Sequence, residues 1–392
     1  MRTAVKDSRG HMKMHESSMI DFVRETGYGD YPNLSNVKKV LVIHLRHIGD
    51  VILSEPVARV LHEQLNPDKI DFLVNEGTEV LLESHPHITN LHVIKRSRFT
   101  HGLKERISEE IRIFRLLKKG GYDLVIGLNP GSRVERCVRF TKAPYRVGPK
   151  KRKVKGAYII KSKCVYNFEV SHAGTRRHYV DRHLDTLRRV GLNVGDSIRS
   201  PDIFEDQDVS LQVKGLLSLN FIKNNTPYIV IHPASRWLFK CLPPFKIAEI
   251  INSVYFRFEV PIIITAGPDA MELDYIQRVK RWLNVKVLDF SGKLTLIQLA
   301  ELIRGADFVI SVDTAALHIA EGVQTPVAAL FGPTFDQDWG PRSSNSRVFA
   351  SHSHACRPCG LDGCGGGKVS ECLSGINVNE VLEFMSAYLQ KN

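Results

Sequence analysis

Several hallmarks of other protein classes are missing from this 392-residue sequence. No run approaches eighteen apolar residues, and the N-terminus lacks the apolar core of a secretory signal, so we expect a cytoplasmic protein. The glycine fingerprint G-x-G-x-x-G does not follow the first apolar run, which argues against a nicotinamide-dependent oxidoreductase. Short repeats of the solenoid type are also missing.

Acidic residues are scarce in one stretch of a chain whose formal net charge is +12 at pH 7. From Arg133 to Lys155, basic residues recur against the single acid Glu135. The stretch is either a solvated basic loop or a contact for phosphates on a nucleic acid, a small molecule or a membrane. A basic nucleic-acid-binding protein is the non-enzymatic alternative, but the stretch offers few aromatic stacking partners.

Cysteines are few except near the C-terminus. Four of the seven lie in the glycine-rich segment "CRPCGLDGCGGGKVSEC": Cys356, Cys359, Cys364 and Cys372. Clustered thiols in a cytoplasmic chain suggest a structural metal site or redox pairing. The spacing C-x2-C-x4-C-x7-C matches neither common zinc template, so the metal remains unspecified.

The apolar pattern predicts an α/β protein with two doubly wound, Rossmann-like domains facing each other across a cleft. Residues 1–36 are polar and are expected to form a flexible extension. Over residues 37–205, and more regularly over 206–392, short apolar strands alternate with amphipathic helices, as in parallel β-α-β units. Residues 160–226 show one clear helix, and the apolar spacing near the C-terminus predicts a final packing helix.

Ligands of such sheets bind outside the carboxyl ends of the strands, which directs attention to Asp50. This residue follows the strand "VLVIHL" and precedes a helix predicted from about Val51 to Leu65. One interpretation is a helix N-cap. The other is a general base that takes a proton from a substrate hydroxyl in the cleft.

The second domain offers groups that suit a diphosphate. Arg236 and Lys240 follow the strand "YIVIHP", and paired cations at a strand end bind phosphates well. After the strand "DFVISVD", Asp313 or Thr314 begins a helix whose N–H groups and dipole favour an anion. The remaining residues expected at this helix start are Ala315, Ala316 and His318.

Two further positions border the predicted donor site. Gly267, in "TAGPDAME", would let a base or ribose approach the backbone. Glu272 could accept hydrogen bonds from ribose hydroxyls, although an exposed helix glutamate needs no such role.

Together these segments resemble family 9 of the glycosyltransferases, the ADP-heptose:lipopolysaccharide heptosyltransferases. The resemblance covers most of the chain from about residue 37. The similar segments are "VLVIHLRHIGDVILSEPV", "IHPASRWLFKC", "TAGPDAMELD" and "FSGKLTLIQLAELIRGADFVISVDTAALHIAEGVQTPVAALFGPT". The forms "RHIGD" and "HPASRWLFKC" look most like the type III members, which add a branching heptose. The chain departs from relatives at Leu242, where tryptophan is common, and at residues 46–48, where some have a serine pair.

The resemblance implies a GT-B fold and an inverting transfer that requires no cofactor or catalytic metal. Asp50 matches the family's catalytic base, and Lys240 its lysine on the donor phosphates. The donor ADP-heptose would also contact Leu294, at an adenine-binding position, and Glu272, which matches the family's ribose-binding acid. The positions that match the heptose and diphosphate loop are Asp313, Thr314, Ala315, Ala316 and His318.

The implied acceptor is the phosphorylated inner core of lipopolysaccharide. Acceptor contacts are expected at Arg46, His47, Gly49, Arg133 and Arg136. The resemblance thus implies a protein at the cytoplasmic face of the inner membrane, in peripheral contact with anionic lipid. We also expect a monomer without a nucleic-acid partner. A family member that uses another nucleotide sugar is the enzymatic alternative.

Overall fold

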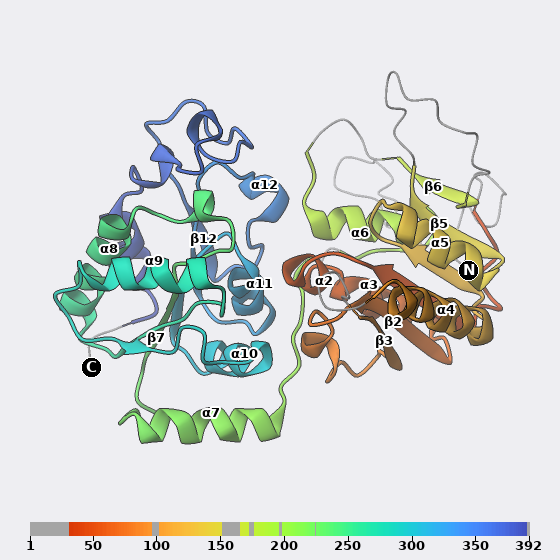
Figure 1. The fold of residues 1–392 in the computed structure, drawn as a ribbon, viewed down its shortest axis with the longest axis horizontal. Helices are drawn as coiled ribbons and strands as arrows, with labels where there is room; N and C mark the ends of the chain where they lie inside the picture. The colour runs from red at the N-terminus through yellow and green to blue at the C-terminus, as the bar shows by residue number, and fades with distance from the viewer. Residues whose placement is uncertain are drawn as a thin grey trace, which may run out of the picture.

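The computed structural model describes residues 31–95, 102–150, 165–171, 176–195, 198–223 and 225–389. These residues form two lobes side by side, each built on one six-stranded sheet (Figure 1). Residues 1–30 of the predicted extension and residues 151–155 of the basic stretch lie outside the described ranges.

The first lobe contains a parallel sheet in the order β3-β2-β1-β4-β5-β6. Helices α4 and α5 pack on one face of this sheet, and α3 and α6 on the other. The strands are β1 (Lys39–His44), β2 (Lys69–Asn75), β3 (Asn90–Ile94), β4 (Leu124–Gly127), β5 (Tyr145–Pro149) and β6 (Phe168–Val170). The helices are α2 (Ile48–Ile52), α3 (Glu55–Leu65), η1 (Val80–Leu82), α4 (Leu103–Gly120), α5 (Ser132–Thr141) and α6 (Tyr179–Arg188).

The second lobe repeats this topology in the order β12-β11-β10-β7-β8-β9, again with all strands parallel. The strands are β7 (Ile229–His232), β8 (Ile262–Ile264), β9 (Leu288–Asp289), β10 (Phe308–Val312), β11 (Val327–Leu330) and β12 (Ser346–Phe349). The helices are α7 (Gln207–Leu219), η2 (Leu238–Lys240), α8 (Pro244–Phe258), α9 (Ala270–Lys280), α10 (Leu296–Arg304), α11 (Ala315–Gly322), α12 (Asp336–Trp339), η3 (Cys364–Gly366), η4 (Glu371–Leu373) and α13 (Val378–Met385).

The predicted alternation of strands and helices is therefore confirmed in both lobes, including the C-terminal packing helix α13. Its residues Val378, Val381, Leu382 and Met385 are buried. Because α6 packs on α3 and α7 packs on α10, we propose the boundary between the lobes near residue 205.

The helix predicted from Val51 to Leu65 is wrong in one respect, since the structure divides it into α2 and α3. Pro56 lies in the first turn of α3. It has no N–H to donate to the carbonyl of Ile52, and its ring would clash with that carbonyl. A continuous helix therefore breaks at Leu53 and Ser54, which orients the first short helix independently of the second.

The described residues of the basic stretch and of the polar middle contain more helix and strand than the sequence indicated. Residues 132–149 form α5 and β5 instead of a loop, and β6 and α7 were not predicted. Gly127 and Gly148 leave room for the Tyr166 ring, because a Cβ atom at either position would lie within 2.4 Å of that side chain. The packing that orders this edge thus depends on glycines, which carry no strand signal.

An apolar contact joins the two lobes. Ile52 of α2 and Leu81 of η1, both from the first lobe, are buried within a cluster formed mainly by the second lobe. Their neighbours there include residues of α10 and α11. Burial of these side chains keeps α2 close to α11.

A second contact between the lobes is polar, and we call it the polar clamp: Arg176, Asp181, Arg182, Asp338 and Arg342. Asp338 accepts hydrogen bonds from Arg176 at 3.3 Å and Arg182 at 3.1 Å. Arg342 pairs with Asp181 at 3.0 Å. These charges link the start of α6 to the α12 region of the other lobe.

None of the helices in the described ranges is both long enough and apolar enough to cross a membrane.

Buried Glu321 of α11 should make stability depend on pH. Burial raises its pKa from 4.5 to about 7, although the backbone N–H of Arg342 donates to it at 2.6 Å. The unfolded chain releases this proton near pH 4.5, so the stability linked to Glu321 is complete below that pH and declines toward pH 7. In the unmodified chain, Glu321 should lower the free energy of unfolding by about 3 kcal/mol over this pH range. The Glu321→Gln variant should lack this part of the decline.

Chemical denaturation at a series of pH values measures this difference. The control is Glu383→Gln, on the exposed side of α13, which should leave the pH dependence unchanged. Identical profiles for Glu321→Gln and the unmodified chain would contradict the assignment.

Candidate active site

The predicted functional residues lie at corresponding positions of the two lobes. In each sheet the strand order reverses at one point, between β1 and β4 and between β7 and β10. Such switch points form ligand crevices at the carboxyl ends of the strands. Asp50 follows β1, Lys240 follows β7 and Asp313 follows β10.

Asp50 lies in the third position of α2 and is half-buried. The N-cap interpretation is wrong in detail, because His47 is the N-cap and donates its backbone N–H to the Asp50 carboxylate at 3.3 Å. Burial raises the pKa of Asp50, and the charges of His47 and Arg46 oppose that rise. The carboxylate is thus oriented by the backbone and made more basic by its surroundings.

Gly49 brings this loop against the second lobe. A Cβ atom at Gly49 would lie 3.0 Å from the His318 ring and 3.9 Å from the Cα atom of Ala315. Both of those residues belong to α11, which packs on α2 across the boundary between the lobes. The residue before Asp50 therefore contacts the start of the predicted donor helix.

The start of α11 suits an anion. Thr314 is its N-cap, in an extended conformation, and its side chain makes no capping hydrogen bond. The backbone N–H groups of Ala315 and Ala316 lie in the first turn of α11. They have no hydrogen-bond partner within the helix, as is general for the first N–H groups of a helix. His318 is buried, its pKa is lowered to about 4 by burial, and its Nδ1 has no hydrogen-bond partner among the described residues. The ring is thus neutral near pH 7 and able to accept or donate one hydrogen bond.

Lys240 and Asp313 form an ion pair beside this helix. Their charged atoms are 2.8 Å apart, with the aspartate almost fully buried and the lysine partly exposed. Both also act electrostatically on His318. The structure thus brings Lys240, which follows β7, and Asp313, which follows β10, close to His318 of α11.

Of the other predicted donor contacts, Gly267 and Arg236 lie near Glu272. This side chain is buried, which raises its pKa, and it accepts the backbone N–H of Gly267 at 3.0 Å. The Gly267 N–H is therefore already bonded, and the exposed-glutamate interpretation is wrong. Arg236 is exposed and close enough to act on Glu272 electrostatically. Leu294 is half-buried against the second lobe's core.

The predicted acceptor contacts divide into two groups. Arg46 and His47 lie beside Asp50. Arg133 and Arg136 lie on α5, where Arg133 pairs with Glu110 of α4. The loop before α5 reaches the first group, because Asn129 accepts the Leu45 N–H at 2.9 Å. A role for the two arginines in binding an acceptor stays a prediction.

The four late cysteines are free thiols, with Cys372 buried and the other three exposed. Burial and the neighbouring thiols raise the pKa of Cys372. Among the described residues, no group of three or more His, Cys, Asp or Glu side chains is placed to hold a metal. The structure thus gives the metal interpretation no support.

Sequence reasoning missed the aromatic wall of the site. Tyr179 of α6 acts electrostatically with Asp50 and Arg46, and it stacks on Trp339 of the other lobe with ring centroids 3.6 Å apart. These residues are distant in sequence from Asp50 and belong to no motif. Only the folded structure shows that α6 lies close to the loop between β1 and α2.

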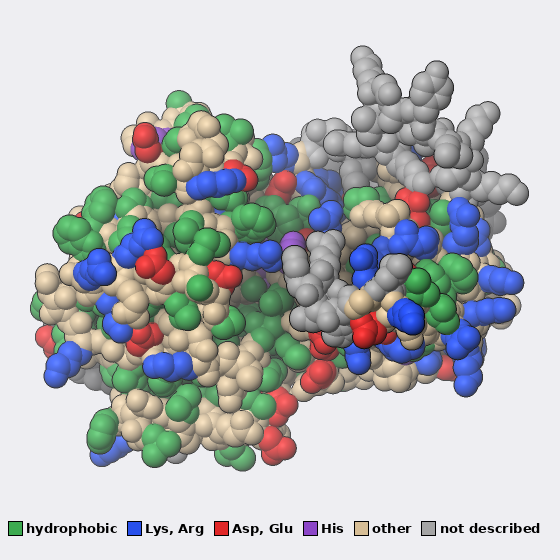
Figure 2. Space-filling model, viewed as in Figure 1, with side chains coloured by type: hydrophobic (Ala, Val, Ile, Leu, Met, Phe, Trp, Pro, Cys, Tyr) green, Lys and Arg blue, Asp and Glu red, His purple; other side chains and the backbone are tan. Residues whose placement is uncertain are grey.

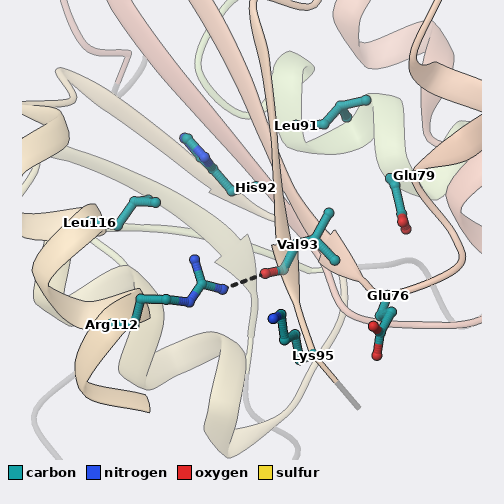
Figure 3. A pocket seen from close by; sticks show the side chains of 8 residues that line it. All are labelled: Glu76, Glu79, Leu91, His92, Val93, Lys95, Arg112 and Leu116. Carbon is teal, nitrogen blue, oxygen red and sulfur yellow. Dashed lines mark hydrogen bonds between the residues drawn. The ribbon is translucent and has the colours of Figure 1, made fainter. Parts of the chain in front are cut away.

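A separate groove of about 440 Å³ lies between β3 and α4 (Figure 3). Its Arg112 points toward the strand, donating to the Val93 carbonyl at 2.8 Å, and also pairs with Glu109. None of the predicted site residues lines this groove, which also carries the carboxylates of Glu76 and Glu79.

Two facing lobes, each built on a doubly wound parallel sheet, are the architecture of the GT-B class of glycosyltransferases. The model of glycosyltransferase family 9 (heptosyltransferase) matches residues 111–369. The chain belongs to this family.

Solved structures and curated relatives agree with this assignment. Lipopolysaccharide heptosyltransferase 3 of Escherichia coli K12 is 29% identical over 80% of this chain and 88% of its own. A family 9 glycosyltransferase from Veillonella parvula superposes with a TM-score of 0.74 at 22% identity, covering 91% of this chain and 98% of that one. Escherichia coli heptosyltransferase WaaC with ADP gives a TM-score of 0.64 at 20% identity, covering 89% and 99%. The same enzyme was also solved with ADP-2-deoxy-2-fluoro heptose. The GT-B fold is thereby confirmed.

The Lys240–Asp313 pair predicts a measurable coupling. Lys240→Met leaves a buried carboxylate without its partner, which should lower the free energy of unfolding by about 2 kcal/mol. Adding Asp313→Asn should restore most of this loss. Denaturation of the four chains in this cycle measures the coupling.

The matched control is Lys246→Met, whose partner Glu249 lies 3.0 Å away but is exposed. Its cost should stay below about 0.5 kcal/mol. Equal costs for the two lysine variants would count against a structural role of the Lys240–Asp313 pair.

Proposed function

We propose that this enzyme transfers heptose from ADP-heptose to the phosphorylated inner core of lipopolysaccharide. The names of the relatives support this donor and acceptor, and the charges of the site are consistent with both. The contact of Gly49 with His318 is the main structural support, because it sets the Asp50 loop against the start of α11.

In the proposed reaction Asp50 takes the proton of the acceptor hydroxyl. At the same time the oxygen of that hydroxyl attacks the anomeric carbon of heptose. The bond from that carbon to the phosphate oxygen breaks, and ADP leaves with the electron pair. Attack from the side opposite to ADP inverts the anomeric configuration. The raised pKa of Asp50 strengthens it as a base, and the charges of His47 and Arg46 favour its ionised form.

The second lobe would stabilise the leaving diphosphate. Its charge grows in the transition state, and fixed donors aimed at it lower the barrier. Those donors are Lys240, Arg236 and the N–H groups at the start of α11, with His318 able to bond a phosphate or sugar hydroxyl. Asp313 would hold the Lys240 ammonium in position. These groups can neutralise the leaving charge without a divalent ion, so we propose a metal-independent transfer.

The remaining contacts of both substrates follow the same arrangement. Glu272 and Gly267 would border the ribose, and Leu294 the adenine. Arg133 and Arg136 would bind acceptor phosphates on the first lobe. Because lipopolysaccharide is held in a bilayer, we propose a monomer in peripheral contact with the cytoplasmic face of the inner membrane.

Thermal stabilisation by a panel of nucleotide diphosphates and their sugars tests the donor. ADP and ADP-heptose should raise the melting temperature more than the uridine and guanosine equivalents. A preference for another nucleotide would favour the alternative that this family member uses a different sugar donor.

Asp50→Asn should lower the turnover number about 100-fold to 10,000-fold, because the positioned base is lost. The affinity for ADP, measured by calorimetry, should remain unchanged, since the diphosphate contacts lie on the other lobe. Strong residual turnover in the purified variant would remove Asp50 from the mechanism.

The pH profile gives an independent test of the base. Since Asp50 must be unprotonated and its pKa is raised above 3.8, kcat/KM should fall with decreasing pH, with the midpoint above that value. The profile is measured over the range in which the chain stays folded. A rate that does not fall throughout this range would contradict the proposed base.

A further inference from the structure

We infer that α4 and α5 form a docking surface for an anionic lipid bilayer. This inference rests on the proposed function, because a lipid-anchored acceptor requires the enzyme to work at a membrane. The surface, which we call the α4–α5 face, has an apolar centre formed by Ile107, Ile111, Phe114 and Phe140. Figure 2 shows green side chains in this region, bordered by blue ones.

Three side chains of the apolar centre are exposed to solvent. The exposed fractions are 51% for Ile107, 42% for Ile111 and 42% for Phe140. Phe140 stacks on Phe114 of the neighbouring helix, with ring centroids 3.9 Å apart. Ile107, Ile111 and Phe114 recur at helical spacing, while Ile113 and Leu117 pack the other side of α4 into the core. The helix therefore has an inner apolar face and an outer one.

Cations border this centre on both sides. No carboxylate in the described ranges pairs with the outer cations of either helix, whereas Arg112 and Arg133 are paired with glutamates. All of the outer cations are exposed: Lys104, Arg115, Lys118 and Lys119 on α4, and Arg136, Arg139 and Lys142 at α5.

This arrangement matches the chemistry of an anionic membrane surface. An interfacial helix inserts apolar side chains at the level of the headgroups while flanking Lys and Arg bind lipid phosphates. Each basic residue near such a surface adds to the attraction for anionic lipid. Nucleic acid would gain little from the isoleucines, and a second protein copy of equal charge would be repelled by the cations. The bilayer is thus the occupant that uses both parts of the face.

The position of the face fits the proposed acceptor path. Helix α5 follows β4, so its N-terminal turn lies at the carboxyl edge of the sheet, the edge at which Asp50 also lies. A bilayer on the α4–α5 face would therefore lie beside the first lobe, within reach of the proposed acceptor residues Arg133 and Arg136.

The test is sedimentation of the full chain with vesicles of phosphatidylcholine, with or without phosphatidylglycerol. The unmodified chain should bind the anionic vesicles and lose binding as salt increases. The double variants Ile107→Ser/Ile111→Ser and Lys118→Glu/Arg139→Glu should each weaken binding at least about tenfold. The control is Leu211→Ser/Leu219→Ser, which removes exposed leucines from α7 of the other lobe and should change nothing.

Four outcomes would overturn the docking surface. In the first two, the unmodified chain fails to bind anionic vesicles or binds neutral ones equally well. In the third, both face variants bind as well as the unmodified chain. In the fourth, the unmodified chain forms a concentration-dependent dimer that the isoleucine variant does not form. Equal weakening of duplex DNA binding by the charge variant would favour nucleic acid instead.

A rate measurement separates this inference from the proposed function. With a delipidated, soluble acceptor, both face variants should transfer heptose at the unmodified rate, because no bilayer is involved. Vesicle binding without any heptose transfer by the unmodified chain would refute the proposed function and leave the docking surface standing. Normal heptose transfer without vesicle binding would refute the docking surface and leave the proposed function standing.

Discussion

The close approach of the β1–α2 loop to the start of α11 is the constraint on which the site depends. Gly49 permits it, because any side chain there would meet the His318 ring. Ile52 and Leu81 support it by burying apolar surface in the opposite lobe. The position of Asp50 relative to the helix start thus follows from packing between the lobes and not from either lobe alone.

Electrostatics gives the two walls of the site different tasks. On the first lobe, burial makes Asp50 more basic while neighbouring cations limit the effect. On the second, Lys240 is fixed by Asp313, and burial keeps His318 neutral. In the proposed reaction, a proton acceptor would therefore face a set of donors for an anion. The polar clamp links the same lobes from the side of α6, so the separation of the walls depends on ion pairs as well as on apolar burial.

Much of this arrangement could be predicted from the sequence, because it rests on local patterns. Buried runs such as β1 and β10 and the small residues after β10 indicate strand ends at which ligands bind. The strand order that makes these ends switch points is known only from the structure. The short strands β5 and β6 could not be predicted, since their order depends on Tyr166 packing over Gly127 and Gly148. Pairs such as Arg182 with Asp338 are distant in the chain and leave no periodic signal. The division of the first helix was readable in principle from Pro56.

The most direct measurement is a crystal structure of the Asp50→Asn chain with ADP-heptose. The account predicts a diphosphate held by Lys240 and the first N–H groups of α11, with the anomeric carbon facing residue 50 across the gap between the lobes. A diphosphate bound elsewhere, for example in the groove between β3 and α4, or a sugar turned away from residue 50, would contradict it.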